Sequence, residues 1–185
     1  MYSISVIVGS LRKESFNKKL MQAVDKLNHP LLKFNRLDIS PIPLFNQDNE
    51  NNMPTAVAHF KKEIENSDGV LFVTPEYNRS IPGVLKNVID WGTRPYGKNC
   101  WAKKSIGIIG TSPGNVGTAV AQAHLKSVLV GLDAIVLGQP EVYIIYKDGL
   151  IDENDNITNE GTAKFLQGFL DKFSGWVQMH HASSP

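Results

Sequence analysis

The sequence predicts an α/β fold in which a five-stranded parallel sheet lies between two layers of helices. Short apolar runs alternate with longer helical patterns, and most of these runs are continuous rather than alternately polar. A continuous apolar run is typical of a strand that is buried on both faces of a parallel sheet. Right-handed crossovers restrict how such a chain winds, and five strands then commonly take the order 2-1-3-4-5. We therefore expect a three-layer sandwich with helices on both faces.

The expected strands and helices follow one another in strict alternation. Strands are predicted at residues 4–8, 31–39, 70–73, 106–109 and 134–137. The second of them contains Lys33, Asn35 and Arg36, which suits an edge strand that faces solvent. Helices are predicted where apolar residues recur at 3.6-residue spacing, around residues 16–27, 57–64, 85–89, 125–132 and 163–177.

Composition limits the classes of function. With 185 residues and 42% hydrophobic content, residues 1–185 suit a single domain. The net charge of +1 argues against a nucleic-acid partner and against an electrostatic membrane anchor. No apolar stretch approaches the ~20 residues of a membrane helix, and no leader signature precedes the first strand, so we expect a cytoplasmic protein. Because Cys100 is the only cysteine and the histidines are scattered, no disulfide and no metal site are expected.

Three loops are expected to meet at one crevice. In a sheet of this order, ligands bind outside the carboxyl ends of the strands, where the strand order reverses. The loops that follow the first, third and fourth strands comprise residues 9–17, 75–83 and 111–117. All three have unusual sequences, so the crevice is the predicted binding site.

The first loop has the composition of a phosphate-binding site. An ordinary helix start carries Asp or Glu, because its free N–H groups present about half a positive charge. The cations around this start are Arg12, Lys13, Lys18 and Lys19. Short hydrogen-bond donors are added by Ser10, Ser15 and Asn17. Such donors at a strand-to-helix turn suit a phosphate dianion. The alternative is that Ser15 is an ordinary N-cap and that the lysines are solvated.

The second loop predicts contact with a planar ring. Pro75 and Pro82 stiffen it, and Tyr77 and Asn78 lie between them. The tyrosine offers an aromatic surface to a ring face, and the asparagine offers an amide to polar ring edges. A planar heterocycle would fit such a loop.

These residues together carry a family resemblance that spans nearly the whole chain. They are Gly9-Ser10, Arg12, Ser15 and Asn17, then Pro75-Glu76-Tyr77-Asn78, Ser80, Pro82-Gly83, Leu85-Lys86-Asn87 and Asp90-Trp91. The sequence resembles the NADPH-dependent FMN reductase family of flavodoxin-like proteins, which includes bacterial quinone and chromate reductases. The resemblance implies a flavodoxin-like fold, bound FMN, and homodimers or homotetramers. Trp91 and Trp101 are candidates either for packing or, with Tyr96, for an apolar interface between subunits.

The resemblance also implies the cofactor-binding residues. The FMN phosphate would contact Ser10, Arg12, Ser15, Phe16 and Asn17. The isoalloxazine ring would contact Pro75, Glu76, Tyr77 and Asn78, and the third loop adds Ser112. Two roles stay open for Glu76, which either faces the flavin or holds its loop through backbone hydrogen bonds. Arg79 and Lys86 meet either the nicotinamide nucleotide phosphates or another subunit.

The implied reaction needs no catalytic side chain. Hydride passes from NADPH or NADH to flavin N5, and two electrons then pass to a small-molecule electron acceptor such as a flavin or quinone. One alternative is a flavodoxin-type FMN carrier that passes electrons to protein partners without being an enzyme. Such carriers are typically acidic, whereas this chain is nearly neutral.

A second alternative is a serine hydrolase that uses Ser112. Gly110-Thr111-Ser112-Pro113-Gly114 matches the G-x-S-x-G nucleophile elbow. The residue after the nucleophile must donate its backbone N–H to the oxyanion, and Pro113 has none. The elbow also leaves the Arg12 loop without a purpose.

Overall fold

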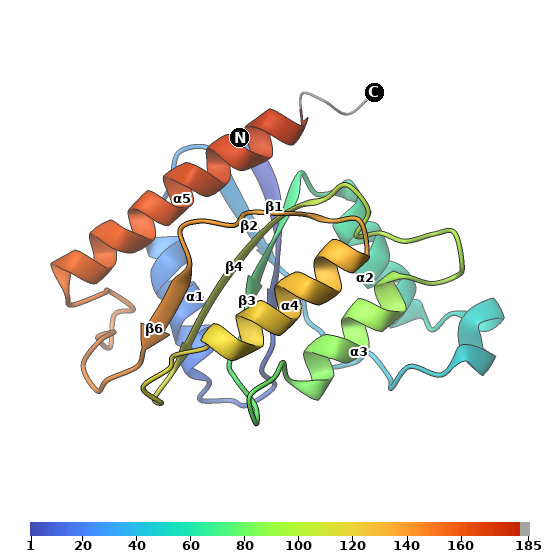
Figure 1. Ribbon diagram of the computed structural model, residues 1–185, viewed down its shortest axis with the longest axis horizontal. Helices are drawn as coiled ribbons and strands as arrows, with labels where there is room; N and C mark the ends of the chain where they lie inside the picture. Colours follow the sequence, from blue (N-terminus) through green and yellow to red (C-terminus); the bar gives the residue numbers. More distant parts are fainter. Residues whose placement is uncertain (182–185) are drawn as a thin grey trace.

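The computed structural model describes residues 1–181 (Figure 1). Its strands are β1 (Tyr2–Val8), β2 (Leu32–Arg36), β3 (Gly69–Val73), β4 (Ser105–Ser112), β5 (Ile135–Val136) and β6 (Val142–Ile145). Its helices are α1 (Phe16–Lys26), the 3-10 helix η1 (Gln47–Asn52), α2 (Thr55–Asn66), α3 (Gly83–Gly92), α4 (Ala119–Gly131) and α5 (Glu160–His181). Within residues 1–181, no helix is long and apolar enough to cross a membrane.

The strands form one parallel sheet in the order β2-β1-β3-β4-β5, which confirms the predicted order. This is the order of the flavodoxin-like fold. β2 lies at the edge, as its polar residues predicted, and only its first residue, Leu32, is buried.

The far edge of the sheet differs from the prediction. A single strand was expected at residues 134–137, but β5 has two residues and pairs only with Ser105 and Ile106 of β4. The chain then leaves the sheet and returns as β6, which pairs with β4 from Ile109 to Ser112. Pro140 lies in the interruption, and proline cannot donate a backbone hydrogen bond to a sheet. The sheet therefore has six strands rather than five.

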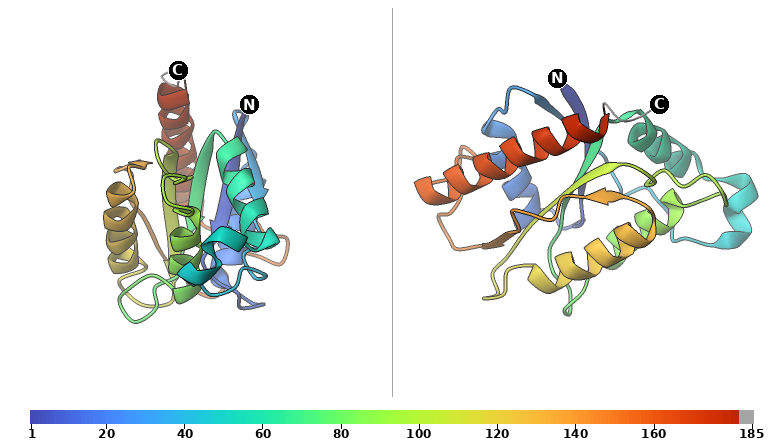
Figure 2. Two further views of the ribbon diagram at one scale, coloured as in Figure 1. Left: turned by 90° about the vertical axis from the view of Figure 1, so that its right-hand side faces the viewer. Right: turned by 45° about the horizontal axis from the view of Figure 1, so that its top comes forward.

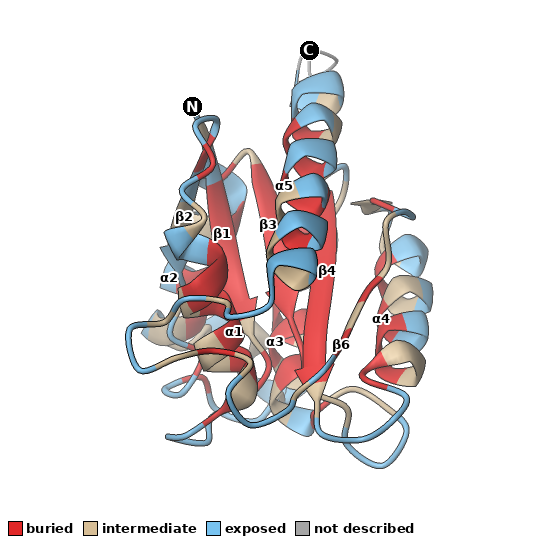
Figure 3. Cartoon of the chain, turned by 90° about the vertical axis from the view of Figure 1, so that its left-hand side faces the viewer, coloured by how far each residue is buried: buried red, intermediate tan, exposed pale blue. Residues whose placement is uncertain are grey.

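Two hydrophobic clusters form the core, one on each face of the sheet. Neighbouring residues of β3 alternate between them: Val70 and Phe72 face α2, α3 and α4, whereas Leu71 and Val73 face α1 and α5. Figure 2 shows α5 running along the sheet apart from α2, α3 and α4. In Figure 3 the central strands are red, and the helices are red only where they turn toward the sheet. The continuous apolar runs are thus explained by burial on both faces.

Trp91 and Trp101 belong to this core and do not form a subunit interface. Both are fully buried within one chain, and the indole N–H of Trp101 donates to the Ile89 carbonyl at 2.9 Å. The indole N–H of Trp91 donates to the Pro43 carbonyl at 2.9 Å. Of the two roles left open for these tryptophans, packing and an interface, the structure shows packing. Tyr96 alone of the three aromatic residues is exposed, at 91%.

Candidate functional site

The three predicted loops meet at the carboxyl ends of β1, β3 and β4, along the lower edge of the molecule in Figure 1. Two sets of hydrogen bonds connect them. Asn17 connects the first loop to Thr111 at the end of β4, and Glu76 connects the second loop to the start of α4. These bonds hold the three loops together at the edge of the sheet where the strand order reverses.

The first loop presents unused backbone donors. Within the part of the chain that the structure describes, the N–H groups of residues 10 through 17 donate to no protein acceptor. Ser15 caps α1, and its hydroxyl accepts from the Lys18 N–H at 3.4 Å. A hydroxyl that accepts one bond keeps its own proton to donate. Ser10 and Ser15 are both buried in the loop. The cap and an anion site are therefore compatible.

An aromatic stack borders this loop. The rings of Phe16 and Tyr146 lie 4.0 Å apart between centroids, and the guanidinium carbon of Arg12 lies 5.4 Å from the Phe16 centroid. This cation–π contact holds the exposed Arg12 side chain beside the loop. Tyr146 was missed in the sequence, because it follows β6, the strand that the apolar pattern did not reveal.

Asn17 has a structural partner for its side chain. It is 2% exposed, its amide donates to the Thr111 carbonyl at 2.8 Å, and its amide oxygen accepts the Thr111 N–H at 3.0 Å. What Asn17 offers to an anion is therefore its backbone N–H at the helix start.

The second loop is a tight hairpin turn. Tyr77 and Ser80 exchange two backbone hydrogen bonds of 2.9 Å, and the two residues between them have positive φ angles, 50° at Asn78 and 63° at Arg79. Two central residues with positive φ are typical of a type I′ turn, in which Asn is favoured at the first position. The turn leaves Tyr77 49% exposed and Asn78 exposed, while Pro75 at its base is half-buried.

Glu76 holds this loop through backbone hydrogen bonds, one of the two roles left open by the sequence. Its carboxylate accepts the N–H groups of Val120 and Ala121, both at 3.0 Å. Thr118, the N-cap residue of α4, forms no side-chain cap, so Glu76 supplies the cap from another loop. Arg79 lies 3.6 Å from the same carboxylate. Lys86 pairs with Asp90 at 2.8 Å.

The third loop explains the G-x-S-x-G match without a nucleophile. The Ser112 hydroxyl donates to the Gly117 carbonyl at 2.5 Å and accepts the Gly114 N–H at 3.3 Å, so its proton closes the loop. A Cβ on Gly110 would lie 2.3 Å from the Thr74 carbonyl oxygen, which requires glycine there. Ser112 and Gly110 of the motif therefore both have a structural role.

The arrangement fits FMN. Unused N–H groups, two buried serines and Arg12 at one loop suit a phosphate, and the exposed Tyr77-Asn78 turn at the neighbouring loop suits a planar ring. Within residues 1–181, no cluster of His, Cys, Asp and Glu could hold a metal ion.

Comparison with known proteins agrees with this geometry. The NADPH-dependent FMN reductase family matches residues 2–148. A 2-hydroxy-1,4-benzoquinone reductase of a Burkholderia species is 49% identical over 95% of this chain and 96% of its own length. A quinone reductase of Pseudomonas putida is 44% identical over 98% of each chain.

A solved structure is also similar over nearly its full length. The flavoenzyme NAD(P)H:(acceptor) oxidoreductase FerB from Paracoccus denitrificans has a TM-score of 0.94 and 47% identity, covering 97% of this chain and 99% of its own. The chain therefore belongs to the NADPH-dependent FMN reductase family, a family of flavodoxin-like oxidoreductases that use FMN with NAD(P)H as the electron donor.

Proposed function

We propose that this protein is an NAD(P)H-dependent quinone reductase that transfers two electrons to a quinone-type acceptor. Two relatives that are 49% and 44% identical are named quinone reductases, and both are covered almost completely. The quinone would be reduced to the corresponding hydroquinone. We further propose that residues 1–185 form one FMN-binding domain that acts in the cytoplasm.

One observation carries the assignment of the cofactor site: the backbone N–H groups of residues 10 through 17 have no protein acceptor. In our proposal these groups, with Ser10, Ser15 and Arg12, hold the FMN phosphate. Phe16 shapes the loop through its stack with Tyr146.

The ring site lies at the other two loops. Pro75, Tyr77 and Asn78 line the isoalloxazine in our proposal, and Glu76 positions their loop by capping α4. Ser112 closes the third loop, whose backbone N–H groups stabilise negative charge at the ring edge. Bound FMN supplies the redox chemistry by accepting hydride at N5 from the donor.

The first test is the visible spectrum of the purified protein, with identification of the released flavin. We expect a yellow protein that releases FMN. A colourless protein that binds no added FMN would contradict the proposed cofactor site.

The second test distinguishes a reductase from an electron carrier. Mixing the FMN-loaded protein with NADPH in a stopped-flow instrument should bleach the flavin rapidly and directly to the two-electron reduced form. Addition of a benzoquinone should then restore the oxidised spectrum. Reduction that occurs only when a partner enzyme is added would favour the carrier instead.

A further inference from the structure

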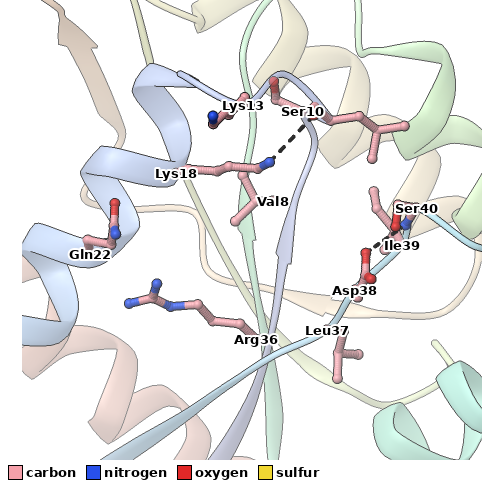
Figure 4. Close-up of a pocket in the computed structure, with 11 residues that line it drawn as sticks. Val8, Ser10, Lys13, Lys18, Gln22, Arg36, Leu37, Asp38, Ile39 and Ser40 are labelled. Carbon is pink, nitrogen blue, oxygen red and sulfur yellow. Dashed lines mark hydrogen bonds between the residues drawn. The ribbon is translucent and has the colours of Figure 1, made fainter.

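A cavity lies beside the first loop, on the side of the edge strand β2 (Figure 4). Its volume is about 500 Å³. All of its lining residues lie between Val8 and Ser40, in the first loop, in α1 and around the end of β2. The second and third loops of the crevice therefore contribute nothing to it.

Two lysines make this cavity attractive to anions. Among residues 1–181, neither Lys13 nor Lys18 forms an ion pair, and the Lys18 ammonium donates one hydrogen bond, to the Leu11 carbonyl at 3.5 Å. Arg36 lines the cavity as well and pairs with Asp25 at 3.0 Å. Both lysine ammonium groups remain available to a ligand.

One carboxylate lies among these cations. Hydrogen bonds from Ser40, including its N–H at 2.9 Å, hold the pKa of the Asp38 carboxyl below its usual range. Asp38 is thus charged at neutral pH, but it already has protein donors. Because Arg36 is already paired with Asp25, the balance is two lysines against one satisfied carboxylate, which still leaves the cavity positive.

The apolar part of its lining distinguishes this cavity from a site that binds inorganic anions alone. Val8, Leu11, Leu37 and Ile39 line it together with the lysines. In Figure 4, Lys18 extends above Val8 toward the loop, and the segment that ends in Ile39 and Ser40 lies opposite α1. Apolar surface beside ammonium groups suits a ligand with a flat base and a phosphate.

We propose that this cavity binds the phosphorylated adenosine end of the donor NADPH, with Lys13 and Lys18 contacting its phosphates. The inference rests on the proposed function. Ser10 belongs both to the cavity wall and to the first loop, so the two sites adjoin. In our proposal the adenosine end is held here and the nicotinamide end extends past the first loop toward the flavin. Two free lysines favour a donor that carries the additional 2′-phosphate.

The direct test is calorimetric titration of the FMN-loaded protein with 2′,5′-ADP, a readout independent of turnover. We expect binding that displaces no FMN and at least tenfold weaker binding of 5′-AMP. The double variant Lys13→Met, Lys18→Met should bind 2′,5′-ADP at least tenfold more weakly. The matched control Lys62→Met removes an exposed charge on α2, outside the cavity lining, and should bind as the wild type does.

The same variants separate donor binding from turnover. In the double variant the KM for NADPH should rise at least tenfold, whereas in Lys62→Met the KM and the rate at saturating NADPH should both match the wild type. If the double variant loses FMN, Gln22→Glu replaces it, because this change adds a carboxylate to the cavity wall on α1. It should weaken 2′,5′-ADP binding at least threefold.

Several results would overturn the proposal: no binding of 2′,5′-ADP, release of FMN by it, inorganic phosphate binding equally tightly, or affinities unchanged in Gln22→Glu. If these occur while NADPH still bleaches the flavin, only this inference fails. If NADPH does not reduce the bound flavin, the proposed function fails first.

Discussion

Asn17 joins two loops that are far apart in the sequence. Both polar atoms of its amide bond the backbone of Thr111, and all of these groups are buried. A buried N–H or carbonyl that loses its partner costs about 1–3 kcal/mol. Asn17 therefore stabilises the fold as well as the geometry of the site.

Replacement of this residue tests the structural role. Asn17→Ala should lower the free energy of unfolding of the FMN-free protein by about 2 to 4 kcal/mol, because both Thr111 groups lose their partner. Urea denaturation measures this free energy, and the absence of FMN removes the stabilisation that a bound ligand would add. Asn35→Ala is the control, since Asn35 bonds Glu63 at the surface, and should cost less than about 0.5 kcal/mol. A loss below about 1 kcal/mol for Asn17→Ala would mean that water replaces the two bonds.

Arg12 is the exposed cation proposed to contact the FMN phosphate. Arg12→Ala should weaken FMN binding by about 1.5 to 3 kcal/mol, or about 10- to 140-fold, because a hydrogen bond to a charged group is lost. Quenching of flavin fluorescence during titration of the FMN-free protein measures the affinity. Lys62→Ala should leave it unchanged. An equally small effect of Arg12→Ala would show that Arg12 faces solvent in the complex.

Cys100 should make stability depend on alkaline pH. It is 5% exposed, and burial raises the pKa of its thiol to about 12. The thiol of the unfolded chain ionises near pH 8.5, so the unfolded state loses a proton that the folded state keeps. Stability is therefore lost as the pH rises above about 8.5.

The size of this effect can be measured against a variant. Between pH 8 and pH 10, the wild type should lose about 2 kcal/mol more stability than Cys100→Ala in urea denaturation. The neighbouring Lys61, whose pKa burial lowers, acts in the opposite direction in both proteins. Identical pH dependence of the two proteins would show that the folded thiol is not shielded.

Helix α4 begins without a cap of its own and receives one from the loop after β3. Glu76 accepts two N–H groups at the positive end of this helix, which joins the Tyr77 turn to the third loop. A carboxylate at a helix start is stabilised by the helix dipole and by direct hydrogen bonds. The position of the proposed ring site thus depends on the start of α4.

Two substitutions at Glu76 separate charge from hydrogen bonding. Glu76→Ala should cost about 1 to 2 kcal/mol of stability and weaken FMN binding, whereas Glu76→Gln retains an acceptor oxygen and should cost less. Thermal denaturation and FMN titration measure the two effects. Lys86→Ala, which removes an exposed pair with Asp90, should change stability by less than about 0.5 kcal/mol. Unchanged FMN affinity in Glu76→Ala would show that the hairpin turn alone holds the loop.

The elements show where a sequence pattern stops being informative. Helices α1, α2, α3 and α5 begin within three residues of their predicted positions, because an apolar stripe of 3.6-residue period has one stable solution against a sheet. Helix α4 begins at Ala119, six residues before the predicted range 125–132. β6 was missed because Val142–Ile145 is short and follows Gly138 and Pro140, which read as a loop. Its pairing with β4 is a long-range contact that no local pattern encodes.

The assembly of the whole molecule remains a proposal. The family resemblance predicts dimers or tetramers, while burial of Trp91 and Trp101 removes two of the three aromatic residues proposed for an interface. Tyr96, in the loop between α3 and β4, is exposed.

Sedimentation velocity tests this expectation. The FMN-loaded protein should sediment at two or four times the 20.5 kDa mass of one chain. Tyr96→Asp should shift the distribution toward the monomer, because a charge buried in an interface without a partner is costly. A wild type that sediments only as a monomer at assay concentration would exclude the proposed oligomer.

The sequence by itself determined the strand order, the two-sided core and the three loops of the crevice, because apolar periodicity and right-handed crossovers restrict a chain of this kind to few arrangements. The loops contained Ser10, Arg12 and the Tyr77-Asn78 pair before any contact was known. Which way a side chain turns was decided only by the tertiary structure. Asn17 turns to Thr111 and Glu76 to α4, because each finds buried backbone groups that need a partner and that come from segments far along the chain.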